Sequence, residues 1–147
     1  MRVRDVMSAP AVTVPPHASL AEVIRLMTEH AVGSVVVVEG GAPCGIVTDR
    51  DLALRGLGAG RSPAARAVEV MSPRPVTVDA ADDVHIAYRT MRRAGVRRLP
   101  VLEGRRVVGV VTVDDLLLDV FQRLSDLLGP VAGNILAEAP GPPARQR

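Results

Sequence analysis

The sequence contains almost no aromatic residues: Phe121 and Tyr88 are the only two, and there is no tryptophan. Proteins that bind single-stranded nucleic acid use aromatic rings to stack the bases, so this chain lacks the usual means of doing so. Its core must instead be built from Val, Leu, Ile, Ala and Met, for which a hydrophobic content of 48% is sufficient. With 147 residues, the chain is long enough for one ordinary domain or two small, closely packed ones.

Cysteine and histidine are scarce, and lysine is absent. Cys44 is the only cysteine, which excludes an internal disulfide bond and a cysteine-rich metal site, and we expect it to be a small buried hydrophobic residue. His17, His30 and His85 have no mutual spacing that suits a metal ion, so we expect them on the surface and expect no metal site. The 18 arginines are offset by 16 carboxylates, and a net charge of +2 is too small to indicate nucleic-acid binding.

Long hydrophobic runs are also missing. No apolar run approaches the length that spans a membrane, and the N-terminus, Met1-Arg2-Val3-Arg4-Asp5, has no apolar segment of the kind found in signal peptides. The sequence therefore predicts a cytoplasmic protein without membrane contact.

One seven-residue pattern occurs twice, as Gly45-Ile46-Val47-Thr48-Asp49-Arg50-Asp51 and, 64 positions later, as Gly109-Val110-Val111-Thr112-Val113-Asp114-Asp115. Each copy indicates a buried strand that ends at a threonine and continues directly into a helix, because Thr followed three residues later by Asp is the spacing of a capping box. The first turn of a helix has unpaired N–H groups and positive partial charge. Each copy is therefore a natural anion site, and phosphate is the commonest anion bound there.

The repeat extends well beyond this pattern, since Val3–Leu52 aligns with Ala67–Leu116 without a gap. Val6-Met7-Ser8 recurs as Val70-Met71-Ser72, and Val12-Thr13-Val14 recurs as Val76-Thr77-Val78. Apolar periodicity and turn residues predict one unit, β-α-β-β-α, written twice, and hence an α+β fold. The predicted strands are Val12–Val14, Ser34–Glu39, Cys44–Thr48, Val76–Val78, Arg98–Glu103 and Val107–Thr112, with helices starting at Ser19, at Asp82 or Asp83, and after each Thr.

The predicted domain organisation has four parts: residues 1–58 form the first repeat, 59–66 a linker, 67–128 the second repeat with an extended C-terminal helix, and 129–147 a short apolar turn and a flexible tail. Gly129-Pro130 is expected to end the last helix, because proline breaks helix interiors. The stripe from Leu117 to Leu128 recurs every three or four residues, as in a packed helix face. From the sequence alone, that face packs either on its own chain or on a second subunit.

Together these features resemble the paired cystathionine-β-synthase (CBS) domain, or Bateman module, over about Val3 to Phe121. The tandem unit, both Gly-x-x-Thr-x-x-Asp stretches and the segment Val96-Arg97-Arg98-Leu99-Pro100-Val101 carry the resemblance. The chain is similar to the stand-alone bacterial members of that family, which have no catalytic domain attached. The resemblance implies two repeats packed by pseudo-twofold symmetry, with two clefts that bind AMP, ADP, ATP or S-adenosylmethionine, and a flat homodimer.

The resemblance also implies roles for individual residues. Asp51 and Asp115 would accept hydrogen bonds from ribose hydroxyls, and Thr48 and Thr112 would bind ribose or phosphate. The candidate phosphate-binding arginines are Arg50, Arg97 and Arg98. The candidate adenine-pocket residues are Val12, Thr13, Val14, Val35, Val76, Thr77, Val78, Leu99 and Pro100. Because the repeats differ at the arginine positions, one cleft is expected to bind nucleotide and the other to be weaker or empty.

The same residues also have simpler interpretations that involve no ligand. The Thr and Asp pairs are explained equally by helix capping alone, and Arg97 and Arg98 by solvated strand ends. The alternative function is a ligand-free scaffold that dimerises through Leu117, Phe121 and Leu124 and presents its C-terminal helix to a partner protein. Nucleic-acid binding through arginines ranks third, and an enzyme last, because no nucleophile, base and orienting group can be assembled from these residues. The arginines concerned are Arg89, Arg92, Arg93, Arg97, Arg105 and Arg106.

Overall fold

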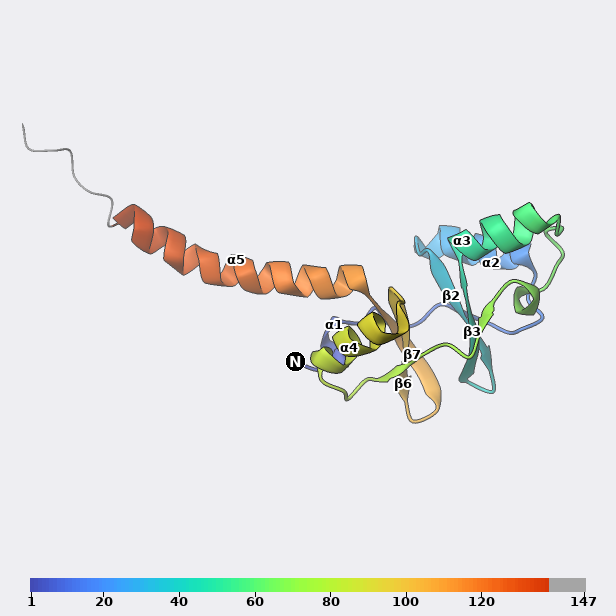
Figure 1. Cartoon of the computed structure of the whole chain (residues 1–147), viewed down its shortest axis with the longest axis horizontal. Helices are drawn as coiled ribbons and strands as arrows, with labels where there is room; N and C mark the ends of the chain where they lie inside the picture. Colours follow the sequence, from blue (N-terminus) through green and yellow to red (C-terminus); the bar gives the residue numbers. More distant parts are fainter. Residues whose placement is uncertain (138–147) are drawn as a thin grey trace, which may run out of the picture.

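The structure, a computed structural model, describes residues 1–137, and side chains up to residue 130. Within this range the chain forms two mixed units of helices and strands, from which a long C-terminal helix projects (Figure 1). The predicted fold class, an α+β chain with two β-α-β-β-α repeats, is confirmed. The predicted tail at Pro140–Arg147 lies outside the described residues.

The first repeat contains β1 (Thr13–Val14), α2 (Leu20–His30), β2 (Ser34–Glu39), β3 (Ala42–Thr48) and α3 (Asp49–Asp51), continued by a π-turn (Leu52–Gly56) and a 3-10 turn (Leu57–Ala59). The second repeat contains β5 (Val78–Asp79), α4 (Val84–Ala94), β6 (Arg98–Glu103), β7 (Arg106–Thr112) and α5 (Val113–Ala137). Three short elements open the repeats: α1 (Val3–Val6), a 3-10 turn (Ala67–Glu69) and β4 (Ser72–Pro73).

Within residues 1–137 the strands form two sheets, ordered β1-β2-β3-β4 and β5-β6-β7. In each, a short strand pairs in parallel with the first strand of an antiparallel hairpin. The first hairpin turns through Gly40 and Gly41, whose φ angles of 58° and 83° are accessible to glycine without steric cost. Because two residues suffice for this turn, β3 begins at Ala42. The sequence predicted a start at Cys44, so the predicted loop between the two strands, which included Pro43, was too long.

The strand predicted at Val76–Val78 is also displaced and occupies Val78–Asp79, whereas its counterpart in the first repeat begins at Thr13. In the first repeat, Val36 N–H donates to the carbonyl of Val12 at 3.0 Å. Pro100 stands at the position equivalent to Val36 and has no N–H to donate. Val76 and Thr77 therefore lie outside the sheet.

The helix α5 does not end where the sequence predicts, because it runs from Val113 to Ala137 with Pro130 inside it. An interior proline removes one backbone hydrogen bond and costs about 3 kcal/mol, but it does not prevent the flanking residues from remaining helical. The predicted helix end at Gly129-Pro130 is wrong, and the apolar segment beyond it belongs to the same helix.

The opening segment of each repeat packs in the core of the other repeat. Val3 is fully buried among Val78, Leu99 and other core residues of the second repeat. Ala67 and Val70 are fully buried in the core of the first repeat. The chain therefore crosses between the two units twice, and the crossing segment at residues 8–12 runs along the space between them.

Candidate functional site

Two helix starts carry the same capping box. At the start of α5, Asp115 N–H donates to Thr112 Oγ1 at 3.1 Å, and Thr112 N–H donates to Asp115 Oδ2 at 2.9 Å. At the start of α3, Asp51 and Thr48 make the same two bonds with the same lengths. The predicted capping is confirmed at both positions. Capping by itself occupies only one oxygen of each carboxylate.

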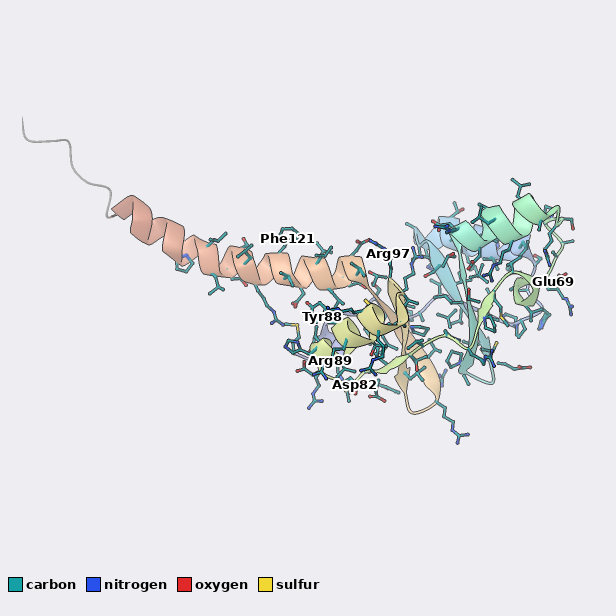
Figure 2. The ribbon with its side chains drawn as sticks, in the orientation of Figure 1. Glu69, Asp82, Tyr88, Arg89, Arg97 and Phe121 are labelled. Carbon is teal, nitrogen blue, oxygen red and sulfur yellow. The ribbon has the colours of Figure 1, made fainter. Side chains whose placement is uncertain are left out.

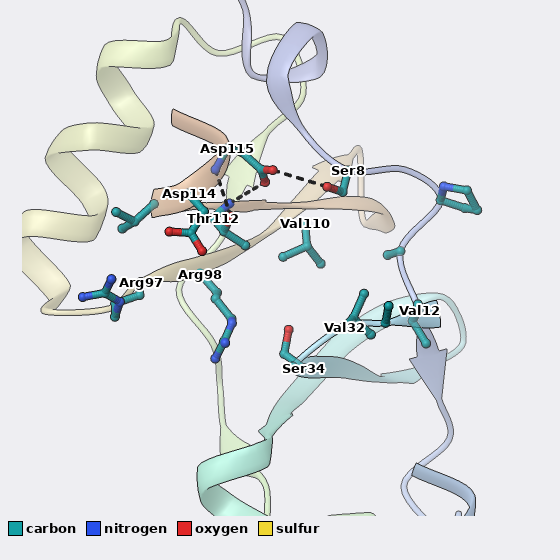
Figure 3. Close-up of a pocket in the computed structure, with 15 residues that line it drawn as sticks. Ser8, Val12, Val32, Ser34, Arg97, Arg98, Val110, Thr112, Asp114 and Asp115 are labelled. Carbon is teal, nitrogen blue, oxygen red and sulfur yellow. Dashed lines mark hydrogen bonds between the residues drawn. The ribbon is translucent and has the colours of Figure 1, made fainter. Parts of the chain in front are cut away.

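A cavity of about 320 Å³ lies beside the second of these helix starts, between the two repeats (Figure 3). Its wall consists of the crossing segment after α1, the turn between α2 and β2, the residues that lead into β6, and the junction of β7 with α5. The lining residues are Ser8, Pro10, Ala11, Val12, Ala31, Val32, Gly33, Ser34, Arg97, Arg98, Val110, Thr112, Val113, Asp114 and Asp115. Both repeats therefore contribute to one site.

Five of the residues predicted from the sequence meet in this cavity: Val12, Arg97, Arg98, Thr112 and Asp115. Sequence reasoning missed the remaining members of its wall. The sequence offered a signal for one of them, because Ser8 belongs to the Val-Met-Ser segment that opens both repeats. The repetition of this segment does not by itself show that Ser8 reaches the carboxylate of Asp115 in the other repeat.

The other predicted site residues lie outside this cavity. Thr48, Arg50 and Asp51 are at the start of α3, in the first repeat. Strand alternation turns Val14, Val35, Val78 and Leu99 into the two hydrophobic cores, where they are almost fully buried. The remaining members of the predicted adenine pocket are outside it too, namely Thr13, Val76, Thr77 and Pro100.

Polar and charged groups of both signs face the cavity. Asp115 is half-buried, and Ser8 Oγ donates to its Oδ1 over a long 3.5 Å, so this oxygen retains capacity to accept further hydrogen bonds. Arg98 is half-buried, whereas Arg97 and Asp114 are exposed. In the described part of the chain, neither guanidinium group forms a hydrogen bond or an ion pair. The cavity thus combines the carboxylates of Asp114 and Asp115 with two arginines that form no ion pair in the described range.

A further charged group, the carboxylate of Asp49, lies close to the site at Gly33. A Cβ built on Gly33 would lie 3.1 Å from Arg98 Nη2 and 3.2 Å from Asp49 Oδ2. Any side chain at this position would meet both groups. Gly33 is therefore the point at which the Arg98 guanidinium and the Asp49 carboxylate, from different repeats, approach each other.

Residues that could ligate a metal do not cluster in groups of three or more anywhere in the described range. His17, His30 and His85 are exposed. Cys44 is half-buried, its Sγ donates to the Val37 carbonyl at 3.4 Å, and burial, with a smaller contribution from the charge of Glu39, raises the pKa of the thiol. None of the helices in residues 1–137 has both the length and the apolar character needed to cross a membrane.

This fold, with a cavity between two interlocked repeats, defines a paired regulatory module, and the sequence comparison agrees: the CBS domain family matches residues 3–57 and again residues 67–121. The chain belongs to the CBS domain family. Proteins with this domain pair are generally regulatory and non-catalytic. Among the relatives, the CBS domain-containing protein YhcV of Bacillus subtilis is 35% identical over 133 residues, which cover 90% of this chain and 94% of YhcV.

Two solved structures that resemble this chain contain ligands. The CBS domain protein PAE2072 from Pyrobaculum aerophilum, complexed with AMP, has a TM-score of 0.72 and 28% identity, covering 79% of this chain and 90% of that one. The CBS domain pair of protein MJ0100, in complex with 5′-methylthioadenosine and S-adenosyl-L-methionine, has a TM-score of 0.74 and 25% identity, covering 84% and 98%. Both ligand sets contain adenosine.

Proposed function

We propose that this chain is a regulatory module that binds an adenosine-containing ligand, either AMP, ADP, ATP or S-adenosylmethionine, in the cavity between its repeats. The observation that carries the proposal is the convergence of Asp115, Thr112 and Arg98 on one cavity. The adenosine-containing ligands in the PAE2072 and MJ0100 complexes support the choice of ligand.

The ribose would bind at Asp115. Its Oδ2 is held by the Thr112 N–H, which fixes the carboxylate, while Oδ1 is the oxygen nearer to Ser8. A fixed carboxylate accepts hydrogen bonds from two adjacent hydroxyls, so it prefers ribose to deoxyribose. Hydrogen bonds to a charged acceptor contribute about 1.5–3 kcal/mol each. The Thr112 hydroxyl lies next to this carboxylate and would complete the polar edge of the sugar site.

A phosphate would bind near Arg98 and Arg97. Both line the cavity without an ion pair among the described side chains, and the positive end of the α5 dipole adds to their charge. Arginine binds phosphate oxygens in a bidentate manner. The adenine ring would lie against the apolar part of the wall, formed by Val12, Val32 and Val110 (Figure 3).

The signal would be a change in geometry. A ligand in this cavity touches both repeats, and Asp115 lies in the first turn of α5, so binding favours one arrangement of the repeats and of that helix. The size of the response is set by the difference in ligand affinity between the two arrangements.

A homodimer would receive the signal. Among the described residues, the apolar stripe of α5 is largely uncovered: its side chains are 46% to 68% exposed, including Phe121 on the projecting part of the helix (Figure 2). Next to its base, an apolar groove of about 360 Å³ lies between α4 and α5 and includes Tyr88 and Val96. Two copies related by a twofold axis would cover both features. The stripe consists of Leu117, Leu118, Val120, Phe121, Leu124, Leu127 and Leu128.

Isothermal titration calorimetry tests the binding proposal, with AMP, ADP, ATP, S-adenosylmethionine and adenosine as ligands and 2′-deoxy-AMP as the matched control. We expect saturable binding by at least one ribonucleotide and weaker binding of the deoxy compound, which lacks one hydroxyl for Asp115. Absence of binding by all of them at millimolar concentration would contradict the proposal. The scaffold alternative predicts that result, but it leaves the cavity and the two arginines that line it without a role.

A further inference from the structure

Arg98 lines the cavity, and its Nη2 lies next to Gly33, another residue of the cavity wall, opposite Asp49 Oδ2. Its half-buried guanidinium makes no hydrogen bond or ion pair to any described residue, although a carboxylate is close. The group is therefore held near a negative charge without being paired to it.

Asp49 is held in this position by two local hydrogen bonds. Its N–H donates to the Gly33 carbonyl at 3.0 Å, and its Oδ1 accepts from the Arg50 N–H at 2.8 Å. The remaining oxygen, Oδ2, faces the space over Gly33. Asp49 does not line the cavity itself, so it can affect a ligand there only through its charge or through Arg98.

We infer that Asp49 is an internal counter-anion that lowers the affinity of Arg98 for a phosphate in the cavity and thereby limits the preference of the site for phosphorylated over uncharged adenosine ligands. The inference rests on the proposed adenosine site. The carboxylate attracts Arg98 toward the Gly33 edge of the cavity, and its charge repels an incoming phosphate. Both effects act on anionic ligands and leave adenosine untouched.

The arrangement of Asp49 and Arg98 around Gly33 occurs only once in the two repeats. At the offset of 64 residues, Asp49 corresponds to Val113, Arg98 to Ser34 and Gly33 to Arg97. The pseudo-symmetric position thus has neither the carboxylate nor the partner arginine. Capping does not require Asp49 either, because Thr48 and Asp51 form the capping box of α3 by themselves.

The test is calorimetric titration of the full chain with AMP and with adenosine, for wild type and Asp49→Asn. We expect the variant to bind AMP about two- to fivefold more tightly, because Asp49 is exposed and its solvated charge lies several ångströms from Arg98. Its affinity for adenosine should not change. Because salt screens exposed charges, the gain should shrink as ionic strength rises.

Two further variants separate the mechanism from a general charge effect. Asp126→Asn makes the same change on the polar side of α5, far from the cavity, and should leave both affinities at the wild-type value. In an Arg98→Gln background, Asp49→Asn should strengthen AMP binding less than it does in the wild type, because only the direct repulsion of the phosphate is then relieved.

Each outcome is informative. An equal gain in AMP affinity with and without Arg98 would overturn the inference while leaving the adenosine site intact, as would an unchanged or weaker AMP affinity in Asp49→Asn. If neither the wild type nor any variant binds AMP or adenosine, the proposed function fails and this inference fails with it. Circular dichroism and melting curves would show that the variants remain folded.

Discussion

Met7 Sδ lies only 2.7 Å from the position that a Cβ on Gly109 would occupy, and the Ser8 carbonyl lies 2.8 Å from it. The pseudo-symmetric pair is at least as close, since Met71 Sδ occupies the same place beside Gly45. In both places the methionine comes from the opening segment of one repeat and the glycine from the sheet of the other. The glycine of the Gly-x-x-Thr-x-x-Asp pattern is thus explained by a close approach between the repeats.

Gly109→Ala should therefore destabilise the fold. The Met7 side chain can shift, but the Ser8 carbonyl is held by its pairing with Val110 and cannot move away easily. Overpacking of this kind typically costs about 1–3 kcal/mol. Chemical denaturation would measure the loss in unfolding free energy.

Gly129→Ala is the matched control for that substitution. Apart from the adjacent helix backbone, no atom of the described residues lies within 4 Å of a Cβ at Gly129, which is in the interior of α5. Alanine favours a helix over glycine by up to about 1 kcal/mol, so this variant should be as stable as the wild type or more stable. If the Gly109 and Gly129 variants are equally stable, the close approach of Met7 and Ser8 to Gly109 does not affect the free energy of unfolding.

The repeat architecture could be predicted because its signals are local. The capping pairs Thr48/Asp51 and Thr112/Asp115 and the helix start at Ser19 depend on residues a few positions apart, and all are found in the structure. The exchange of opening segments is different. Nothing in the sequence shows whether Val3 packs with its own repeat or with the other, since both cores are built from the same residue types.

The cavity wall was only partly predictable for the same reason. Asp115 and Arg98 follow from a motif, but Ser8 and the turn at Ala31–Ser34 reach the cavity through the packing of one repeat on the other. Strand alternation, applied more strictly, would have placed Val35 and Leu99 in the cores. The late start of β5 could also have been predicted, because Pro100 lacks the N–H that this pairing needs.

Asp83 makes the start of α4 sensitive to acid. The His85 N–H donates to its Oδ1 at 2.9 Å, which is the main reason that the pKa of Asp83 lies below its usual value of 3.8. The N-terminal amine, His85 and Arg123 lower it further by their charge. A lowered folded-state pKa contributes stability that is present above pH 3.8 and is lost as the pH falls through the folded value.

Asp83→Asn isolates this contribution, because asparagine caps a helix about as well as aspartate but does not titrate. Melting temperatures of both proteins should fall with acidification, and that of the wild type should fall more steeply below pH 3.8. Parallel curves for the two proteins would mean that protonation of Asp83 does not weaken the cap.

The proposed dimer predicts an effect of charge on the apolar stripe of α5. Phe121→Arg or Leu124→Arg should convert the protein to a monomer, because each would bury an unpaired guanidinium in an apolar interface. Gln122→Arg is the control: Gln122 is on the polar face, where it donates to Asp126 at 3.0 Å. Sedimentation velocity over a range of concentrations would measure this, and a wild-type protein that stays monomeric would refute the dimer.

The two capping carboxylates provide the sharpest test of the site, because Asp51 and Asp115 make the same local hydrogen bonds but only Asp115 lines the described cavity. Asp51→Ala and Asp115→Ala should each lose about 1 kcal/mol of stability. Asp115→Ala should in addition bind the adenosine ligand about ten- to a hundredfold more weakly, since it loses hydrogen bonds to a charged acceptor. Comparison of denaturation and calorimetry separates the two effects. If both variants weaken binding equally, the ligand is not held by Asp115 in particular, and the start of α3 takes part in binding as well.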